Sequence, residues 1–249
     1  MKLAGGGEFT QPLMPNNVGG FIGIPGFGGK YNLALVDVKD YTGAVTGKTL
    51  SPVQANPAAQ LDVIGGAGKY FGNMGVPGAK SYHLVTPGYG SAANLAIGAA
   101  NPYFVRFATS ATTTVLADAM AQNPTFFSLW IGGNDVLSYS TSGGTNSTTV
   151  GGVTTYTTAT DQTGNTNPAT YKSNDISDPN VVAGSIKAVL DGLKSKGATK
   201  GVISNIPYVT SIPYFTRVPY NPIPLSAASA SALNANFGQL NTALTSLGQ

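Results

Sequence analysis

The chain has 249 residues, of which 42% are hydrophobic and only 9% are charged, with a formal net charge of +3. This length and apolar content exclude a wholly disordered protein and allow one sizeable core or two small ones, of which a single domain is the simpler interpretation. The absence of cysteine excludes disulfides, thiol catalysis and cysteine-based zinc sites, and a single histidine excludes a histidine-rich metal site. Because the few charges have both signs and Lys and Arg do not cluster, the sequence lacks the basic footprint of a nucleic-acid-binding protein.

The N-terminal part of the chain is predicted to consist of loops and edge strands. Residues 5–57 are rich in Gly and Pro and contain only short apolar pieces, such as Phe21–Ile24 and Leu33–Val36. Further on, Thr113–Gln122 is predicted to form a short helix that an Asn-Pro pair ends. The nearly uninterrupted apolar or β-favouring run Thr125–Ile131 then predicts a strand buried on both faces of a parallel sheet.

A polar segment, Ser138–Asn174, follows with Thr, Ser, Gly and Asn and few apolar residues. It is predicted to be an insertion into a single domain that spans residues 1–249, and its β-favouring residues are also compatible with a small hairpin. Its low apolar content predicts that it is the most mobile internal region. The sequon Asn146-Ser147-Thr148 is weak evidence of glycosylation, because Thr-rich sequences produce sequons by chance.

Strand and helix alternate again in the C-terminal part of the chain. Asp178-Pro179 predicts the start of a helix, with Asp as the N-cap and Pro at the first helical position. Lys200–Pro207 follows as a second buried strand, and the strand–helix–strand order is that of a doubly wound α/β sheet. A last helix is predicted from an apolar stripe, which indicates core packing: Leu233, Phe237, Leu240, Leu244 and Leu247.

The strongest candidate for a functional site is the end of the first predicted buried strand, at Gly132-Gly133-Asn134-Asp135. Parallel sheets bind ligands beyond the carboxyl ends of their strands, and Asn134 would stand at such an end. The two glycines would allow a ligand to approach the backbone closely, so the Asn134 amide could donate hydrogen bonds into a crevice. Taken alone, such a motif is more commonly a glycine turn capped by Asn and Asp.

A second motif lies upstream, Asn73-Met74-Gly75-Val76-Pro77-Gly78-Ala79-Lys80-Ser81, and the two segments together resemble the SGNH/GDSL hydrolase family of esterases and lipases. The segment Asn205–Tyr214 resembles the same family, so the similarity covers nearly the whole chain. The resemblance implies a flavodoxin-like three-layer α/β fold with a sheet of mainly parallel strands. It also implies an oxyanion hole in which Gly78 gives a backbone N–H and Asn134 gives a side-chain N–H. Preorganised donors of this kind contribute about 3 to 4 kcal/mol each in ester hydrolysis, and we expect these two to converge on one small pocket.

The sequence departs from the family pattern at both catalytic blocks. It contains no Gly-x-Ser-Leu, which carries the nucleophile in the family, and no Asp-x-x-His near its C-terminus, which supplies the base. The single histidine, His83, could act as a base with Ser81 or Ser91 as the nucleophile, but a lone His in a Gly/Pro-rich loop is more commonly solvated or a local hydrogen-bond partner. The resemblance therefore assigns neither a nucleophile nor a base, and no hydrolysis is expected of this chain. A missing N-terminal block would explain the departure, so the fold is expected to be incomplete at its N- and C-termini.

Two functions of different classes follow. The resemblance implies a carboxylic-ester hydrolase acting on an acylated glycan or lipid, without cofactor or metal. The alternative is a non-catalytic glycan- or lipid-binding surface protein on a degenerate hydrolase fold, in which C-terminal aromatic residues could stack on sugars: Tyr208, Tyr214, Phe215 and Tyr220. Low charge with abundant Gly, Ser, Thr and Asn is typical of extracytoplasmic proteins. The N-terminus nevertheless has no signal-like apolar segment, and no stretch of the sequence is apolar for long enough to predict a membrane span.

Overall fold

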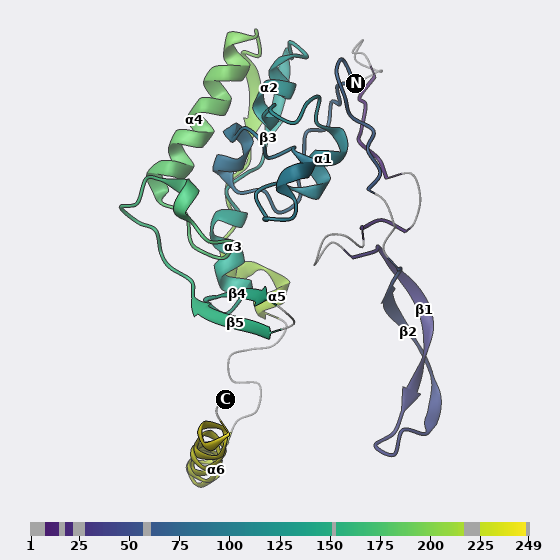
Figure 1. Cartoon of the computed structure of the whole chain (residues 1–249), viewed down its shortest axis with the longest axis vertical. Coiled ribbons are helices and arrows are strands. Elements are labelled where there is room, and N and C mark those ends of the chain that lie inside the picture. The colour runs from purple at the N-terminus through teal and green to yellow at the C-terminus, as the bar shows by residue number, and fades with distance from the viewer. Residues whose placement is uncertain are drawn as a thin grey trace. The chain divides into compact units, whose positions relative to one another are not determined.

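The computed structural model describes residues 8–14, 18–21, 28–56, 61–150, 153–216 and 225–247. The chain divides into two compact units, Met1–Ile206 and Pro207–Gln249, and each is described by itself (Figure 1). The strands are β1 (Tyr31–Lys39), β2 (Val45–Gln54), β3 (Phe126–Leu129), β4 (Thr145–Val150), β5 (Val153–Thr158) and β6 (Lys200–Ile203). The α-helices are α1 (Pro102–Phe107), α2 (Val115–Met120), α3 (Asn134–Thr141), α4 (Pro179–Ser195), α5 (Pro213–Thr216) and α6 (Ala227–Ser246). Short 3-10 helices are η2 (Ser81–Val85), η3 (Ala92–Asn94), η4 (Pro168–Thr170) and η5 (Val209–Ser211).

The predicted flavodoxin-like three-layer fold with a mainly parallel sheet is wrong. The described strands form three two-stranded sheets, of which β1–β2 and β4–β5 are antiparallel and only β3–β6 is parallel. The two antiparallel sheets are hairpins whose strands are joined by short connections, and short connections permit only antiparallel pairing. The strand–helix–strand rhythm is present once, where β3 and β6 pair from Phe126↔Lys200 to Leu129↔Ile203.

The first hairpin is more regular than the Gly- and Pro-rich sequence around it predicts. Strands β1 and β2 pair along their whole length, so Leu33–Val36 lies inside a nine-residue strand. The turn between the strands is closed by Asp40, whose Oδ1 accepts hydrogen bonds from Thr42 N–H and Ala44 N–H at 2.8 and 3.1 Å. Of the other apolar piece, Phe21–Ile24, only Phe21 is among the described residues.

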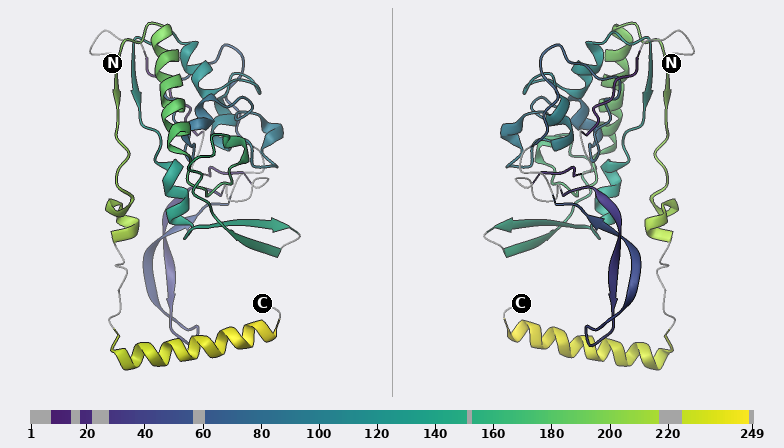
Figure 2. Two further views of the ribbon diagram at one scale, coloured as in Figure 1. Left: turned by 90° about the vertical axis from the view of Figure 1, so that its left-hand side faces the viewer. Right: turned by 90° about the vertical axis from the view of Figure 1, so that its right-hand side faces the viewer.

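Strand β3 is buried on one face only, whereas its apolar sequence predicts burial on both. Phe127, Leu129 and Ile131 pack against the core, but Phe126 and Trp130, which point the other way, are 53% and 72% exposed. The reason is that the helices of this unit, including α4, lie along one face of the β3–β6 pair (Figure 2). An apolar run in the sequence therefore does not distinguish a doubly covered strand from a singly covered one.

The helix termini follow local sequence signals. Asp178 caps α4 as predicted, since its Oδ1 accepts hydrogen bonds from Asn180 N–H and Val181 N–H at 2.8 and 3.1 Å. In the second unit α6 carries the predicted apolar stripe, but within that unit the side chains are exposed, as are Tyr208 and Tyr214. Tyr220 lies outside the described residues. No helix in the described ranges is both long and apolar enough to cross a bilayer.

A run of aromatic rings leads from the core of the first unit toward its surface. Phe104, which is fully buried, contacts Phe107 and Tyr89 with ring centroids 5.4 and 6.3 Å apart. Tyr89 stacks on His83 at 4.3 Å with an interplanar angle of 14°, and Tyr82 meets the edge of His83 at 4.4 Å. This run fixes the imidazole against the core and places it beside the second sequence motif.

Candidate functional site

Gly78 lies in a tight turn that its own motif builds. Ala79 N–H donates to Val76 O at 3.1 Å, with Pro77 and Gly78 as the two central residues. Gly78 has a φ of +78°, which the third position of a type II turn requires and which glycine adopts without strain. Asn101 Nδ2 donates to Pro77 O at 2.9 Å and so holds the turn in place. Gly78 is exposed, and its N–H has no protein acceptor in the described part of the chain.

Asn134 lies beside this turn. It is the first residue of α3, and its Nδ2 donates to Ala79 O at 2.9 Å across 55 residues of sequence. Gly132 makes the sharp passage from β3 into α3 possible, because its φ is +101° and a Cβ there would lie 2.5 Å from Ile206 Cδ1. Ala79 O uses one of the two Asn134 amide hydrogens, so the second can bind a ligand. The structure therefore places Asn134 next to the Gly78 turn, and their convergence on one oxyanion stays a prediction.

A buried carboxylate locks the two motifs together. Ser81 is completely buried, and its N–H and Oγ donate to Asp135 Oδ2 and Oδ1 at 2.8 and 2.9 Å. The carbonyl of Asp135 accepts a further hydrogen bond from Ser177 N–H at 3.0 Å. Ser81 therefore has a structural role, because its hydroxyl is both inaccessible to a substrate and committed to a carboxylate rather than to a base.

A second buried carboxylate anchors the segment that follows. Asp175 is 1% exposed, and its carboxylate oxygens accept four hydrogen bonds at 2.7 to 2.9 Å, from Asn146 Nδ2, Thr160 N–H, Gln162 Nε2 and Lys172 N–H. Burial alone would raise the pKa of Asp175, but these hydrogen bonds hold it below its ordinary value. The segment 159–178 is thus tied down by polar contacts, although its sequence offers few apolar ones.

The same network reaches the candidate site through Lys80. Its Nζ, which is buried, donates to the Asp175 carbonyl oxygen at 2.6 Å. Burial lowers the pKa of Lys80, while the negative charges of Asp135 and Asp175 act in the opposite direction. The predicted insertion is therefore attached to the loop that follows Gly78. The side chain of the sequon residue Asn146 belongs to the same network, because Asn146 is 4% exposed and its amide nitrogen donates a hydrogen bond to Asp175.

His83 and Asn134 bind the two ends of one peptide group. Asn134 Nδ2 donates to Ala79 O, and the N–H of the same peptide, which belongs to Lys80, donates to His83 Nδ1 at 3.0 Å. Because Nδ1 accepts this bond, the proton of the neutral imidazole lies on Nε2. Burial lowers the pKa of His83 to about 4, and the charge of Lys80 acts in the same direction. An imidazole whose acceptor nitrogen is already occupied cannot take a proton from a serine, so neither Ser81 nor Ser91 forms a nucleophile–base pair with it.

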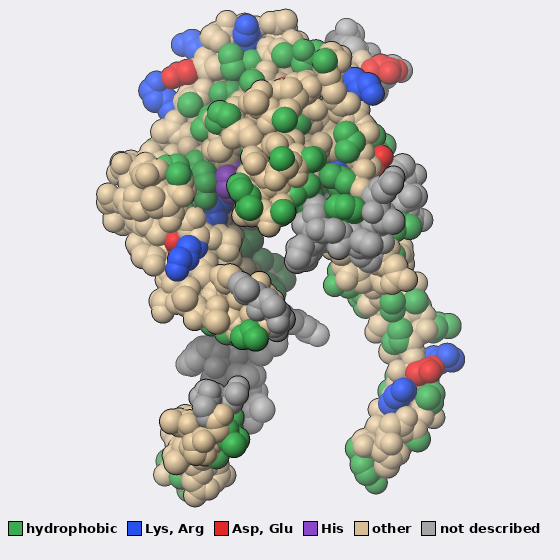
Figure 3. All heavy atoms as spheres, in the orientation of Figure 1, with side chains coloured by type: hydrophobic (Ala, Val, Ile, Leu, Met, Phe, Trp, Pro, Cys, Tyr) green, Lys and Arg blue, Asp and Glu red, His purple; other side chains and the backbone are tan. Residues whose placement is uncertain are grey.

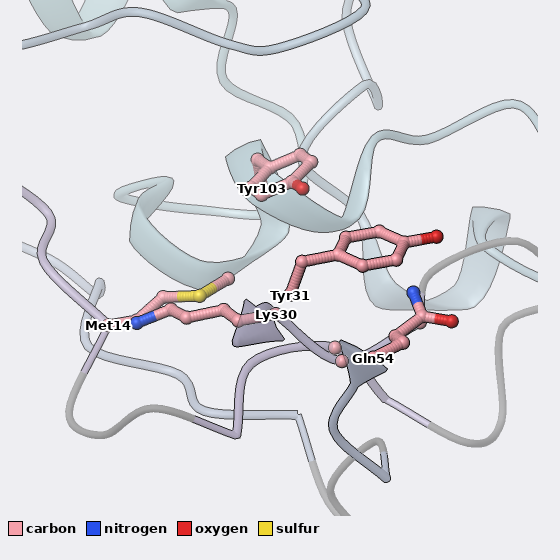
Figure 4. Close-up of a pocket in the computed structure, with 8 residues that line it drawn as sticks. Met14, Lys30, Tyr31, Gln54 and Tyr103 are labelled. Carbon is pink, nitrogen blue, oxygen red and sulfur yellow. The ribbon is translucent and has the colours of Figure 1, made fainter. Parts of the chain in front are cut away.

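A separate cavity of about 410 Å³ lies where the β1–β2 hairpin begins (Figure 4). Five side chains and three glycines line it: Met14, Gly20, Gly28, Gly29, Lys30, Tyr31, Gln54 and Tyr103. None of these residues belongs to the two motifs, so the cavity is not part of the candidate site. Among the residues that the structure describes, no group of three or more His, Asp or Glu side chains could hold a metal ion.

Comparisons of the chain with protein-family models, with curated proteins and with solved structures gave no match. The candidate site therefore rests on the geometry of its own residues. The sequence indicates two of them, Gly78 and Asn134. Sequence reasoning missed the residues that hold them in place, namely Asn101, Lys80 and Asp175. No periodicity or spacing identifies these residues, because each acts through a partner that is distant in the sequence.

Proposed function

We propose that this chain carries the ester-binding part of a carboxylic-ester hydrolase site of the SGNH type. In this proposal Gly78 N–H and the Asn134 amide donate hydrogen bonds to the carbonyl oxygen of an acylated glycan or lipid. The observation that carries it is the hydrogen bond of 2.9 Å from Asn134 Nδ2 to Ala79 O, which brings the two motifs into contact. Neutral donors that are fixed before the substrate arrives are suited to the negative charge that develops on an ester carbonyl.

Rigidity of the donors supports this proposal. The Gly78 turn is held by Asn101, and the start of α3 is held by the Ser81–Asp135 pair, so both donors have supports of their own. Such supports reduce the reorganisation needed when a substrate binds. The low fraction of charged residues supports an extracytoplasmic location as part of the same proposal.

The second candidate, a non-catalytic binding protein, is favoured by the state of Ser81 and His83. Ser81 is buried against Asp135, and His83 already accepts a hydrogen bond at Nδ1. We therefore expect the chain to bind esters without hydrolysing them. A steady release of p-nitrophenol from p-nitrophenyl acetate that Ser81→Ala abolishes would show instead that Ser81 is a nucleophile.

Nuclear magnetic resonance titration of the 15N-labelled chain tests ester binding directly. We expect butyl acetate to shift the Gly78 amide and the Asn134 side-chain amide signals in a saturable way. Asn134→Ala should weaken binding about 3- to 10-fold, the effect of one lost neutral hydrogen bond. Asn241→Ala, at an exposed position of α6, is the matched control and should leave binding unchanged. An ester that shifts neither the Gly78 nor the Asn134 signals would refute the proposed function.

A further inference from the structure

The β1–β2 hairpin carries an exposed apolar face. Tyr31, Leu33 and Leu35 alternate along β1 and therefore share one face, and the register sets Pro52 and Leu50 of β2 opposite Leu33 and Leu35. The exposed fractions of Tyr31, Leu33, Leu35 and Leu50 are 63 to 73%. Figure 3 shows hydrophobic side chains in green along this hairpin. A two-stranded sheet with such a face is only marginally stable by itself and gains stability from further strands.

The outer edge of β1 is open. Ala55 N–H donates to Lys30 O at 2.8 Å, so the backbone of Lys30 faces β2. Because backbone groups alternate in direction along a strand, those of Tyr31, Leu33 and Leu35 face away from β2. Among the described residues, no hydrogen bond from outside the hairpin engages these three backbone groups. Strand β1 therefore presents a row of unpaired donors and acceptors, which is a template for another strand.

The outer edge of β2 is blocked by a proline. Since the backbone of Leu33 faces away from β2, its pair with Pro52 is a non-hydrogen-bonded one, and the nitrogen of Pro52 faces the outer edge of β2. Proline has no N–H to donate there, and prolines on edges hinder the addition of a strand. Each hairpin thus has one open edge. An assembly through that edge is complete with two copies, whereas two open edges would allow a continuous fibre.

The charges of β1 favour an antiparallel arrangement of the two copies. Asp37 and Lys39 are the charged residues of this strand. Parallel pairing in register would set each of them opposite its own copy, and like charges directly opposite each other are destabilising. Antiparallel pairing centred on Leu35 separates the like charges and sets Leu35 opposite Leu35 of the second copy. It also uses all nine residues of the strand.

We propose that two copies of this chain pair along β1 and form a two-fold symmetric, four-stranded antiparallel sheet with the order β2–β1–β1–β2. Each copy presents the same edge to the other, as an isologous dimer requires. The apolar faces of the two hairpins become one continuous face in this sheet. The dimer involves neither Gly78 nor Asn134, so it is independent of the proposed function.

Sedimentation velocity and amide exchange of the full chain test the dimer first. The chain should change from monomer to dimer as its concentration rises over roughly 1 to 200 μM. In the same range the exchange of the Tyr31, Leu33 and Leu35 amides should slow, while that of Asn32 and Ala34, which face β2, should stay constant. A chain that is monomeric throughout, or that forms assemblies larger than a dimer, would overturn the proposal.

A charge swap at Leu35 tests the register, because this residue lies on the two-fold axis and faces its own copy. Leu35→Lys should weaken the dimer tenfold or more, since it places two like charges opposite each other, and Leu35→Glu should do the same. An equal mixture of the two variants should dimerise again, because opposite charges then meet. This recovery also shows that the variant chains are folded. A mixture that stays monomeric would refute the proposed register.

Leu50→Lys is the matched control. Leu50 lies on the same face as Leu35 with nearly the same exposure, 65 against 63%, but on the strand whose edge Pro52 blocks. The Leu50→Lys chain should dimerise like the wild type. Equal weakening by Leu35→Lys and Leu50→Lys would mean that the hairpins pack face to face, and it would rule out pairing along β1. A dimer that Leu35→Lys leaves intact would place the interface elsewhere and would equally disprove the proposal.

Discussion

The protonation of His83 should make the stability of this protein fall between about pH 6.5 and about pH 4. Burial lowers the pKa of His83 from 6.5 to about 4 in the folded chain. Between these values the unfolded chain binds a proton that the folded chain does not, so stability is complete above the unfolded pKa and is lost as the pH falls. Protonation would also put a hydrogen on Nδ1, where Lys80 N–H now donates. Because one pKa unit corresponds to about 1.4 kcal/mol, the full loss is about 3 kcal/mol.

Urea unfolding of the wild-type chain and of His83→Phe at several pH values measures this effect. The free energy of unfolding of the wild type should fall by most of the roughly 3 kcal/mol by about pH 4.5. That of His83→Phe should fall little. The chain has one histidine, the facing tyrosines Tyr82 and Tyr89 have raised pKa values, and the pKa of Asp175 lies below 3.8. Neither these tyrosines nor Asp175 titrates in this window. Parallel stability curves for the two proteins would refute the neutral state and the lowered pKa of His83.

Three further predictions concern stability and local order. Asp175→Ala leaves four donors without their acceptor and should lower the free energy of unfolding by roughly 3 to 5 kcal/mol. Asp175→Asn should lower it by less. An equal loss in both variants would contradict this explanation. Phe104→Ala should cost about 3 to 5 kcal/mol in urea unfolding because the ring is fully buried, and Phe126→Ala, at a half-exposed ring, should cost much less. Limited proteolysis followed by mass spectrometry should give first cuts in the exposed strand β5 rather than in the segment 159–178, and early cuts in that segment would mean that the Asp175 network does not hold it.

The segment Ser138–Asn174 shows what composition leaves out. Its few apolar residues predict that it is the most mobile internal region, and this stays a prediction that proteolysis tests. The structure compensates with polar contacts, because Asp175 collects donors from several points of the segment and Lys80 binds its carbonyl. Such contacts depend on where a carboxylate lies in space, and no local pattern reveals that.

The candidate site also combines features that the sequence indicates with features that only the folded chain decides. Asn134 follows from the end of an apolar strand, whereas Gly78 was indicated by the resemblance to the SGNH/GDSL family, and the structure gives its positive φ in the Pro77-Gly78 turn. For His83 the sequence left open a solvated side chain or a local hydrogen-bond partner, and the structure shows that it accepts a bond from Lys80, three residues away. Its fixed tautomer depends also on Tyr89 and on the Ala79–Lys80 peptide, which only the folded chain brings into place.

Local sequence determined some features of this protein, such as the Asp178 cap of α4 and the strand that ends before Asn134. These features depend on interactions between residues that are close in the chain, and short patterns report such interactions. The tertiary structure alone decided how the strands pair and which face of β3 is covered. It also decided which buried groups Asp135 and Asp175 bind. The physical reason is that strand pairing and the burial of a carboxylate are stabilised by partners far away in the sequence, so their energies are not encoded in any one segment.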